Sequence, residues 1–82
     1  MEFEWDDAKS EANFAKHGFD FEHAIQIFDG PVREHVDPRP WGERRIVATG
    51  QVQGEFITVV YTRRNRRYRI ISARPARRIE RF

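Results

Sequence analysis

The sequence predicts an α+β fold in which two N-terminal helices pack on an antiparallel sheet of about four strands, followed by a short C-terminal helix or tail. Three observations favour this architecture. Apolar residues recur at helical spacing up to residue 28, and the spacing changes to strand-like alternation beyond residue 32. Short polar links then separate the extended segments, which is typical of an antiparallel meander. With 82 residues, the chain is expected to form one domain over residues 1–82.

The first helix is expected over about residues 7–17. Asp6 or Asp7 is placed to accept hydrogen bonds from its free N-terminal amides. Gly18 follows Lys16-His17 and can adopt the left-handed conformation that commonly ends a helix. The apolar stripe of this helix is expected to consist of Ala8, Ala12 and Ala15, with Phe14 as a larger anchor beside them.

A second helix is expected to begin after Asp20 and to end at Asp29-Gly30-Pro31. Its apolar side chains occur at i, i+3, i+4 and i+7, so they share one face that can cover a sheet. These side chains are Phe21, Ala24, Ile25 and Phe28.

Extended segments are expected at residues 32–36, 46–49, 55–62 and 68–72, with turns between them. Strand alternation separates two faces of the third segment. One face has Phe56, Thr58, Val60 and Thr62, and the other has Ile57, Val59 and Tyr61. The same alternation predicts that Arg69 and Ile71 point away from Tyr68, Ile70 and Ser72. The helices are expected to cover one face and leave the other partly open.

The last seven residues, 76–82, are expected to form about two helical turns or a frayed tail. Ile79 and Phe82 are the only apolar pair at helical spacing in this segment.

The composition restricts the class of protein. There is no cysteine, so neither disulfides nor thiolate metal sites contribute, and the composition suits the cytoplasm. No apolar run approaches the roughly 20 residues of a transmembrane helix, and no contact with a membrane is expected. Aromatic residues make up 13% of the chain, which favours a folded domain over disorder.

Charge is distributed unevenly along the chain. Residues 1–37 contain ten acidic and three basic side chains, whereas residues 63–82 contain nine arginines and one glutamate. Only two of the fifteen basic residues are lysines, and guanidinium groups suit planar recognition of phosphate and stacking on bases. A polyanionic partner is therefore expected. The alternative is that the arginines pair with the acidic half of the chain or with an acidic partner protein.

Sequence motifs argue against most hydrolytic mechanisms. The three histidines, His17, His23 and His35, are scattered and form no metal-ligand motif, and no metal site or cofactor is expected. No phosphate-binding glycine loop or GxSxG nucleophile occurs. The remaining chemistry is RNA cleavage by attack of the substrate's own 2′-OH, which requires cations and proton carriers.

Arg63, Arg69 and Arg74 are predicted to contact phosphate because they lie at the end of one strand, within the next strand and at its exit. Each of them is alternatively a solvated charge at a strand edge. His17 is a candidate proton carrier, or simply a cap that compensates the helix dipole. Glu43 is a candidate base, or a partner of Arg44 or Arg45.

Further RNA contacts are expected from aromatic and basic side chains. Trp41 lies in a loop and is the better candidate for stacking on a base, whereas Trp5 is expected in the core. The other predicted RNA-binding residues are Lys16, Arg45, Arg67 and Phe82.

The order of several motifs resembles the BrnT toxin family over nearly the whole chain. The N-terminal half contributes Phe3-Glu4-Trp5-Asp6, Lys9, Asn13, Lys16-His17-Gly18, Phe21, Ala24, Phe28-Asp29 and Pro31. The C-terminal half contributes Glu43, Arg45, Gly50, Val59-Val60-Tyr61-Thr62-Arg63, Arg69-Ile70-Ile71-Ser72-Ala73-Arg74, Ala76 and Glu80. The Lys-His-Gly and Arg-Ile-Ile-Ser-Ala-Arg runs are the most specific of these motifs.

This resemblance implies a RelE-like fold, a ribonuclease activity that blocks translation, and neutralisation by a ribbon-helix-helix, BrnA-like antitoxin. It also implies RNA as substrate, possible association with the ribosome, and binding of operator DNA only by the toxin–antitoxin complex. Family members usually end with a tyrosine, whereas this chain ends Glu80-Arg81-Phe82. A phenolic proton carrier is therefore missing there.

Two alternatives to a ribonuclease toxin remain open from the sequence. One is a non-catalytic module that binds nucleic acid or an antitoxin and acts in autoregulation of the operon. The other is an inactive relative retained for antitoxin binding. An antitoxin is expected either to cover the basic region from Arg63 to Arg74 or to bind the helical side.

Overall fold

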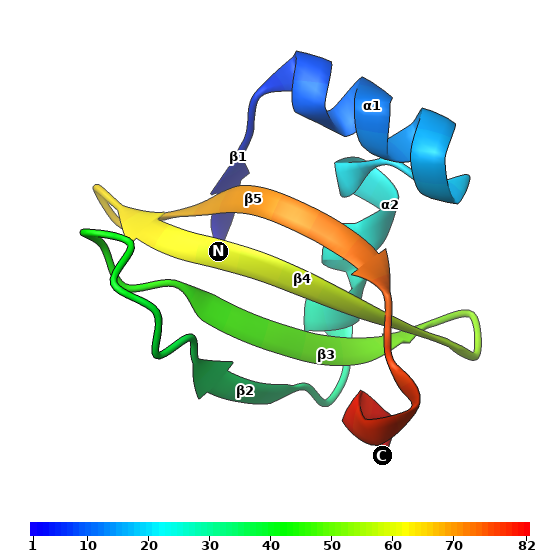
Figure 1. Cartoon of the computed structure of the whole chain (residues 1–82). Helices are drawn as coiled ribbons and strands as arrows, with labels where there is room; N and C mark the ends of the chain where they lie inside the picture. Colours follow the sequence, from blue (N-terminus) through cyan, green and yellow to red (C-terminus); the bar gives the residue numbers. More distant parts are fainter.

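The computed structural model describes all 82 residues and contains one five-stranded sheet with helices on it (Figure 1). The elements are β1 (Glu2–Glu4), α1 (Asp7–His17), α2 (Phe21–Ala24), the 3-10 helix η1 (Ile25–Asp29), β2 (Arg33–Val36), β3 (Ile46–Val52), β4 (Glu55–Arg64), β5 (Arg67–Pro75) and the 3-10 helix η2 (Arg78–Glu80). The strand order is β1-β5-β4-β3-β2. The α+β class is as expected, but the sheet has five strands instead of about four.

The additional strand is β1, which pairs with β5 in parallel, whereas all other strand pairs are antiparallel. Phe3 lies opposite Tyr68 and Glu4 lies opposite Arg69. A segment of three residues is too short to show alternation, and its pairing joins opposite ends of the chain. Local sequence patterns therefore could not predict it.

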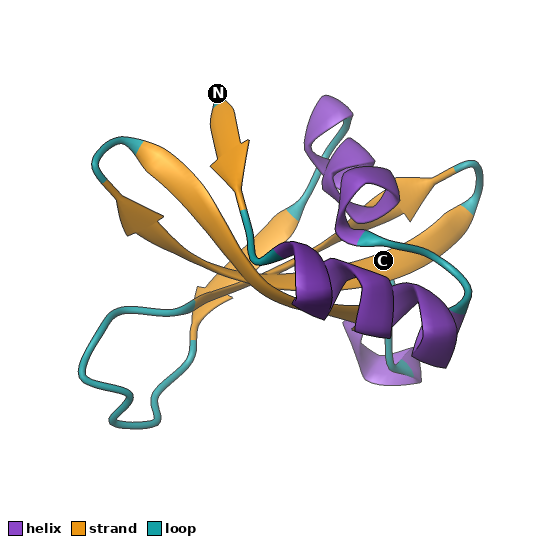
Figure 2. Cartoon of the chain, turned by 90° about the horizontal axis from the view of Figure 1, so that it is seen from above, coloured by secondary structure: helices purple, strands orange, loops and turns teal.

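The helices cover one face of the sheet and leave most of the other open. α2 and η1 pack against β3, β4 and β5, and α1 packs on β5 (Figures 1 and 2). We call the face under α2 and η1 the helical face and the opposite one the open face. The open face is the one toward the viewer in Figure 1.

The core lies between the helical face and α2–η1. Its fully buried side chains include Phe21, Ile27, Ile57, Val59 and Ile70. The indole of Trp5 packs edge-on against Phe21, with ring centroids 6.3 Å apart, so Trp5 belongs to the core as expected.

Helix α1 has the expected bounds and caps, but a different face of it is buried. The Asp6 carboxylate accepts hydrogen bonds from the amides of Ala8 and Lys9, and Gly18 ends the helix at φ 84°. The expected stripe of Ala8, Ala12 and Ala15 is exposed, and Phe14 is 59% exposed. The helix has 11 residues, and no helix of the structure has the length and hydropathy needed to cross a bilayer.

Polar contacts replace the expected apolar stripe of α1. The buried hydroxyl of Ser10 accepts a hydrogen bond from the Phe21 amide at 3.0 Å. The amide of Asn13 donates to the Phe19 carbonyl at 2.9 Å. These bonds connect α1 to the start of α2, so the polar side of α1 faces the protein. The alanine prediction was wrong because alanine buries little area and cannot satisfy these backbone groups.

The second predicted helix is present as two shorter ones. Asp20 caps α2 by accepting from the His23 amide, as expected, and the chain tightens into η1 after Ala24. Tightening places Ile27 in the core, where it is fully buried. A Cβ at Gly50 of β3 would lie only 2.9 Å from the Ile27 Cβ, so this glycine permits the close approach.

The two faces of β4 follow the predicted alternation, but β5 is interrupted by a β-bulge. Val60 lies opposite Ser72 and Tyr61 lies opposite Ile70, so Ile71 is the additional residue. Ser72 therefore lies on the open face together with Arg69, which corrects the expectation that the two point apart. The irregularity also moves Arg74, opposite Thr58, onto this face.

The tail contains one 3-10 turn, η2, instead of two helical turns. Ile79 and Phe82 do not form the expected pair: Ile79 is 89% exposed, and the Phe82 ring packs edge-on against Phe56 at 5.5 Å. The tail lies against the open face, because the hydroxyl of Thr58 in β4 donates to the Glu80 carboxylate at 3.2 Å.

Candidate functional site

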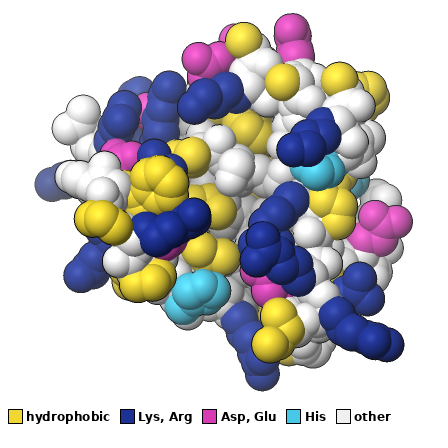
Figure 3. All heavy atoms as spheres, viewed as in Figure 1, with side chains coloured by type: hydrophobic (Ala, Val, Ile, Leu, Met, Phe, Trp, Pro, Cys, Tyr) yellow, Lys and Arg dark blue, Asp and Glu magenta, His cyan; other side chains and the backbone are white.

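Two adjoining cavities lie on the open side of the molecule along β5. The larger, about 320 Å³, lies between α1 and β5, and we call it the α1–β5 cleft. The second is lined by side chains of β4, β5, the start of α1 and the chain before β3. Lys9 and Ile71 line both cavities, so the two cavities adjoin. Figure 3 shows Lys and Arg side chains on both sides of a hollow in this face.

The α1–β5 cleft is lined by basic, neutral polar and apolar side chains and by no carboxylate. Its basic side chains are Lys9, Lys16, His17 and Arg74. Asn13 and Ser72 add polar groups. α1 presents the lysines because they are seven residues apart and therefore share one side of the helix. This lining suits an anionic ligand such as phosphate.

The second cavity contains more basic than acidic side chains. Lys9, Arg45, Arg64 and Arg69 face two carboxylates in it, those of Asp6 and Glu43. Both cavities together therefore form a basic surface along β5, and two of the predicted phosphate contacts, Arg69 and Arg74, lie in it.

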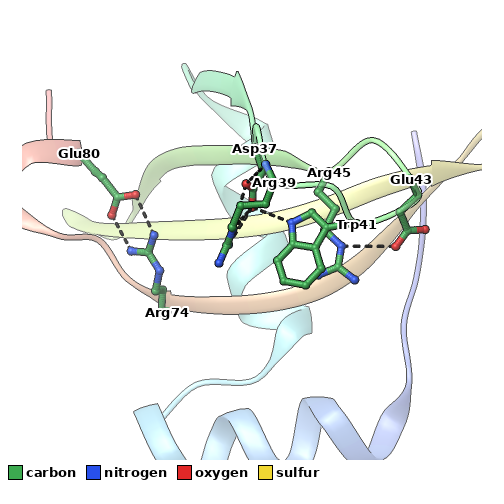
Figure 4. Close-up of polar contacts among 7 residues, drawn as sticks. All are labelled: Asp37, Arg39, Trp41, Glu43, Arg45, Arg74 and Glu80. Carbon is green, nitrogen blue, oxygen red and sulfur yellow. Dashed lines mark hydrogen bonds and ion pairs between the residues drawn. The ribbon is translucent and has the colours of Figure 1, made fainter.

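Arg74 is held in place by Glu80 of the tail. Its guanidinium donates two hydrogen bonds to this carboxylate, at 2.5 and 2.9 Å (Figure 4). Arg74 and the hydrogen bond from the Arg77 amide lower the pKa of Glu80 to about 2. A guanidinium has five N–H donors, so three of those on Arg74 remain for a ligand.

Arg69 and Arg67 interact with the acidic side chains of β1. Arg69 donates to the Glu4 carboxylate at 3.1 Å, and its side chain is 31% exposed. Arg67 forms longer ion pairs with Glu2 and Glu4, at 3.4 and 3.8 Å, and is 55% exposed. The N-terminal strand therefore orients Arg69 toward the second cavity, whereas Arg67 lies outside both cavities.

Glu43 is engaged by two cations. It forms an ion pair with Arg45 at 3.4 Å and with Arg64 at 3.6 Å, so the expected pairing with Arg45 is present. Arg44 does not pair with it, and its backbone carbonyl instead accepts a hydrogen bond from Thr62. The Glu43 carboxylate therefore serves as an ion-pair partner of Arg45 and Arg64.

His17 lies at the end of α1 and lines the α1–β5 cleft, as does its neighbour Lys16. The imidazole stacks on the ring of Phe19, with ring centroids 6.0 Å apart. The centroid of the His23 ring lies 5.9 Å from that of the same Phe19 ring. The stacking orients the imidazole that lines the cleft. Of the three histidines, only His17 lines either of the two cavities.

Arg63 is not part of this basic surface. It lies opposite Tyr68, and its guanidinium stacks on that ring 4.6 Å from the centroid. Tyr68 packs against Phe3 and Phe28 on the helical face. Arg63 therefore does not lie with Arg69 and Arg74, because alternation along β4 directs it to the opposite face.

The tyrosines also lie on the helical face. The Tyr61 hydroxyl donates to the Glu34 carboxylate at 2.6 Å, and the Tyr61 ring stacks on Tyr68 at 4.7 Å. Burial and the Glu34 carboxylate raise the pKa of Tyr61 well above its usual value. Neither tyrosine lines the α1–β5 cleft or the second cavity.

The two remaining aromatic candidates differ in their surroundings. Trp41 is 41% exposed and has Arg45 within 4.0 Å and Arg39 within 4.6 Å of its ring centroid. Phe82 is 42% exposed, contacts Phe56, and has the guanidinium of Arg33 5.0 Å above its ring. Trp41 therefore adjoins the second cavity through Arg45, whereas Phe82 packs the tail against Phe56 of β4.

Sequence reasoning missed several residues that line the two cavities, above all Lys9, Asn13 and Arg64. Lys9 had a usable signal, its seven-residue separation from Lys16 on one helix. The role of Glu80 in holding Arg74 had none, because it depends on where the tail lies. No group of three or more His, Asp or Glu side chains converges to hold a metal ion.

Comparison with known families agrees with this arrangement. A family model described as the ribonuclease toxin, BrnT, of type II toxin-antitoxin systems matches residues 5–80. Comparisons with curated proteins and with solved structures gave no match. The matched range includes α1, the whole sheet beyond β1, and Glu80. The chain therefore belongs to the BrnT family of ribonuclease toxins, whose partners in type II systems are protein antitoxins.

Proposed function

We propose that this protein is a metal-independent endoribonuclease toxin that inhibits translation in the bacterial cytoplasm and cleaves RNA in the α1–β5 cleft. The observation that carries the proposal is the lining of this cleft: four basic side chains and no carboxylate. Such a lining attracts a phosphodiester, and it lacks the carboxylates with which proteins usually bind Mg²⁺.

The reaction assigned to the cleft is attack of the substrate's 2′-OH on the adjacent phosphorus, which expels the 5′-oxygen of the next nucleotide. Negative charge builds on the phosphate oxygens as the new bond forms. Lys9, Lys16 and the remaining N–H donors of Arg74 are placed to offset this charge, and Arg69 adds a second contact further along the RNA backbone.

Two proton transfers accompany this reaction: the 2′-OH loses a proton and the leaving 5′-oxygen gains one. His17 is the candidate for proton transfer because it lines the cleft and imidazole titrates near neutral pH in its ordinary state. Glu43 is not assigned this role, because its carboxylate is paired with Arg45 and Arg64.

The antitoxin is proposed to be a ribbon-helix-helix, BrnA-like protein that neutralises the toxin and binds operator DNA together with it. The family supports a protein antitoxin, and the resemblance of the ordered motifs supports its class. A short ribbon-helix-helix reading frame beside the gene, and co-purification of its product with this chain, are the expected results.

Purified protein is incubated with free RNA in excess EDTA, and with translating ribosomes in the Mg²⁺ buffer that they require, to test the ribonuclease proposal. Cleavage in either sample is expected, with 2′,3′-cyclic phosphate and 5′-hydroxyl ends, because these are the products of 2′-OH attack. Ribosome association is supported if only the translating sample is cut.

Different outcomes identify the alternatives. Intact RNA in both samples, with salt-sensitive RNA binding, would identify a non-catalytic binding module. Intact RNA without such binding, and normal growth on expression alone, would identify an inactive relative that retains only antitoxin binding. Products with 3′-hydroxyl ends would contradict the proposed chemistry even if RNA is cleaved.

A further inference from the structure

We infer that Trp41 is a platform for an unpaired nucleobase and that it makes the protein selective for single-stranded over double-stranded RNA. The inference rests on the proposed function of the α1–β5 cleft as a phosphate site, and it adds a base site about which that proposal says nothing. It is carried by three observations: the fixed position of the indole, its two guanidinium neighbours, and its connection to the second cavity.

The indole is fixed although it lies in a loop without regular secondary structure. Its Nε1 donates to the Asp37 carboxylate at 3.0 Å (Figure 4). The same carboxylate accepts from the backbone and side chain of Arg39, at 3.0 and 2.8 Å. The Asp37 amide in turn donates to the Arg45 carbonyl at 2.9 Å, which closes the loop. These bonds reduce the conformational entropy that a ligand must overcome on binding.

The Trp41 indole is not part of the hydrophobic core. Its side chain is absent from the buried cluster under α2 and η1, and 41% of the residue is exposed. An exposed tryptophan whose only polar atom is already bonded offers a flat apolar surface to solvent. Such a surface suits a ligand that is itself flat.

The two guanidinium groups beside the ring differ in exposure. Arg45 lies 4.0 Å from the ring centroid, is 23% exposed, and is paired with Glu43. Arg39 lies 4.6 Å from it and is 69% exposed. A base that stacks on the ring face beside Arg39 displaces this exposed guanidinium, and with it the bond to Asp37 at 2.8 Å, while Arg45 stays. Nucleobases stack on indole and on guanidinium planes alike, so the displaced arginine can still contact the base or its phosphate.

Arg45 connects this platform to the phosphate sites. It lines the second cavity together with Arg64, Arg69 and Lys9, and Lys9 also lines the α1–β5 cleft. An RNA strand that follows the basic surface therefore passes Trp41. In a duplex the base faces are stacked on one another and cannot reach the ring. A single strand presents them, so stacking distinguishes the two forms.

The test uses 2′-O-methyl RNA, which has no free 2′-OH and so measures binding independently of cleavage. An oligonucleotide carrying 2-aminopurine is titrated as a single strand and as a duplex, into the parent protein and into Trp41→Leu, Trp41→Phe and the control Phe14→Leu. Phe14 is another exposed aromatic residue, on α1 and outside both cavities. Circular dichroism checks that each variant is folded.

The parent is expected to bind the single strand more tightly than the duplex and to quench 2-aminopurine. Trp41→Leu should lose the quenching and bind the single strand about tenfold more weakly, since one base–aromatic stack contributes ~1–3 kcal/mol. Trp41→Phe should keep most of the quenching and most of the single-strand affinity. Phe14→Leu should match the parent in quenching and in affinity. Binding of inorganic polyphosphate should not change in any of them.

Equal single-strand binding by the parent and Trp41→Leu overturns the inference, as does equal binding of duplex and single strand by the parent. A Trp41→Leu variant that loses affinity for a polyglutamate peptide but binds single-stranded RNA like the parent overturns it too. Trp41 would then be reassigned to binding an acidic protein. Failure of the proposed function gives a different pattern: Lys9→Gln and Lys16→Gln then bind polyphosphate as the parent does, while 2-aminopurine quenching remains.

Discussion

Arg69 and Arg74 project from the same face of the sheet although an odd number of positions separates them along β5. Regular alternation would direct them to opposite faces. The bulge at Ile71 adds one residue to β5, so the alternation is shifted by one position between the two arginines. Arg69 lies opposite Thr62 and Arg74 lies opposite Thr58, both on the open face. One additional residue in one strand thus assembles the basic surface that the family's ribonuclease activity is proposed to use.

The first prediction compares two arginines on opposite faces. Arg69→Gln should lower RNA cleavage at least tenfold, because it removes the proposed phosphate contact in the second cavity. Arg63→Gln should stay within twofold of the parent, because its guanidinium stacks on Tyr68 on the helical face. Initial rates with a labelled RNA measure both. Equal losses in the two variants would show that the substrate uses another surface.

His17 and His23 provide a second matched pair, because both rings contact Phe19 but only His17 lines the α1–β5 cleft. His17→Gln should reduce the cleavage rate ~10²-fold or more while RNA binding changes little, as expected for loss of a proton carrier. His23→Gln should cleave normally. If His17→Gln instead weakens binding and rate in equal proportion, the imidazole only contacts the RNA.

The ion pair between Arg74 and Glu80 predicts a dependence of stability on pH. Because the pKa of Glu80 is lowered to about 2, its ionised form stabilises the fold above its ordinary pKa of 4.5. This contribution, about 1–2 kcal/mol after allowance for solvent screening, should be lost as the pH falls from 4.5 to 2.

Urea unfolding of the parent and Glu80→Gln at several pH values measures this effect. The difference in free energy of unfolding between them should be largest at neutral pH and shrink toward pH 2. The variant Glu55→Gln, at an exposed position of β4, serves as control and should follow the parent. A difference for Glu80→Gln that is constant over the whole range would mean that its charge does not contribute.

Gly50 is expected to tolerate no side chain. In Gly50→Ala the new Cβ would lie 2.9 Å from the Ile27 Cβ and 3.0 Å from the Val32 Cγ1, so η1 must move away from β3. We expect a loss of ~1–3 kcal/mol in the free energy of unfolding. Gly30→Ala is the control, since nothing lies within 4 Å of the position that its Cβ would occupy and its φ is −131°. Similar stabilities of the two variants would contradict the close packing.

The buried hydroxyl of Ser10 is expected to contribute to stability through a single bond. Ser10→Ala leaves the Phe21 amide without its acceptor, which should cost ~1–3 kcal/mol. Ser72→Ala, at an exposed position, should be neutral within experimental error. Chemical denaturation measures the stability of both variants. An unfolding midpoint of Ser10→Ala equal to that of the parent would show that another acceptor replaces the hydroxyl.

Local patterns in the sequence determined much of this protein. Asp6, Asp20 and Gly18 delimit the helices where capping rules place them, since a cap acts on amides two or three residues away. Alternation in β4 separated its two faces correctly, and the arginine-rich C-terminal half indicated an anionic ligand. The ordered motifs were sufficient for the family, as the match over residues 5–80 confirms.

Only the tertiary structure decided which of these residues act together. The parallel pairing of β1, the bulge at Ile71 and the contact of Glu80 with Arg74 all join positions by geometry that no local period encodes. Arg63 follows the regular alternation of β4 onto the helical face, whereas the register shift in β5 places Arg69 and Arg74 together on the open face. Lys9 enters the site because α1 packs by its polar side. The sequence specified the side chains and their local structure, whereas long-range strand register specified the site.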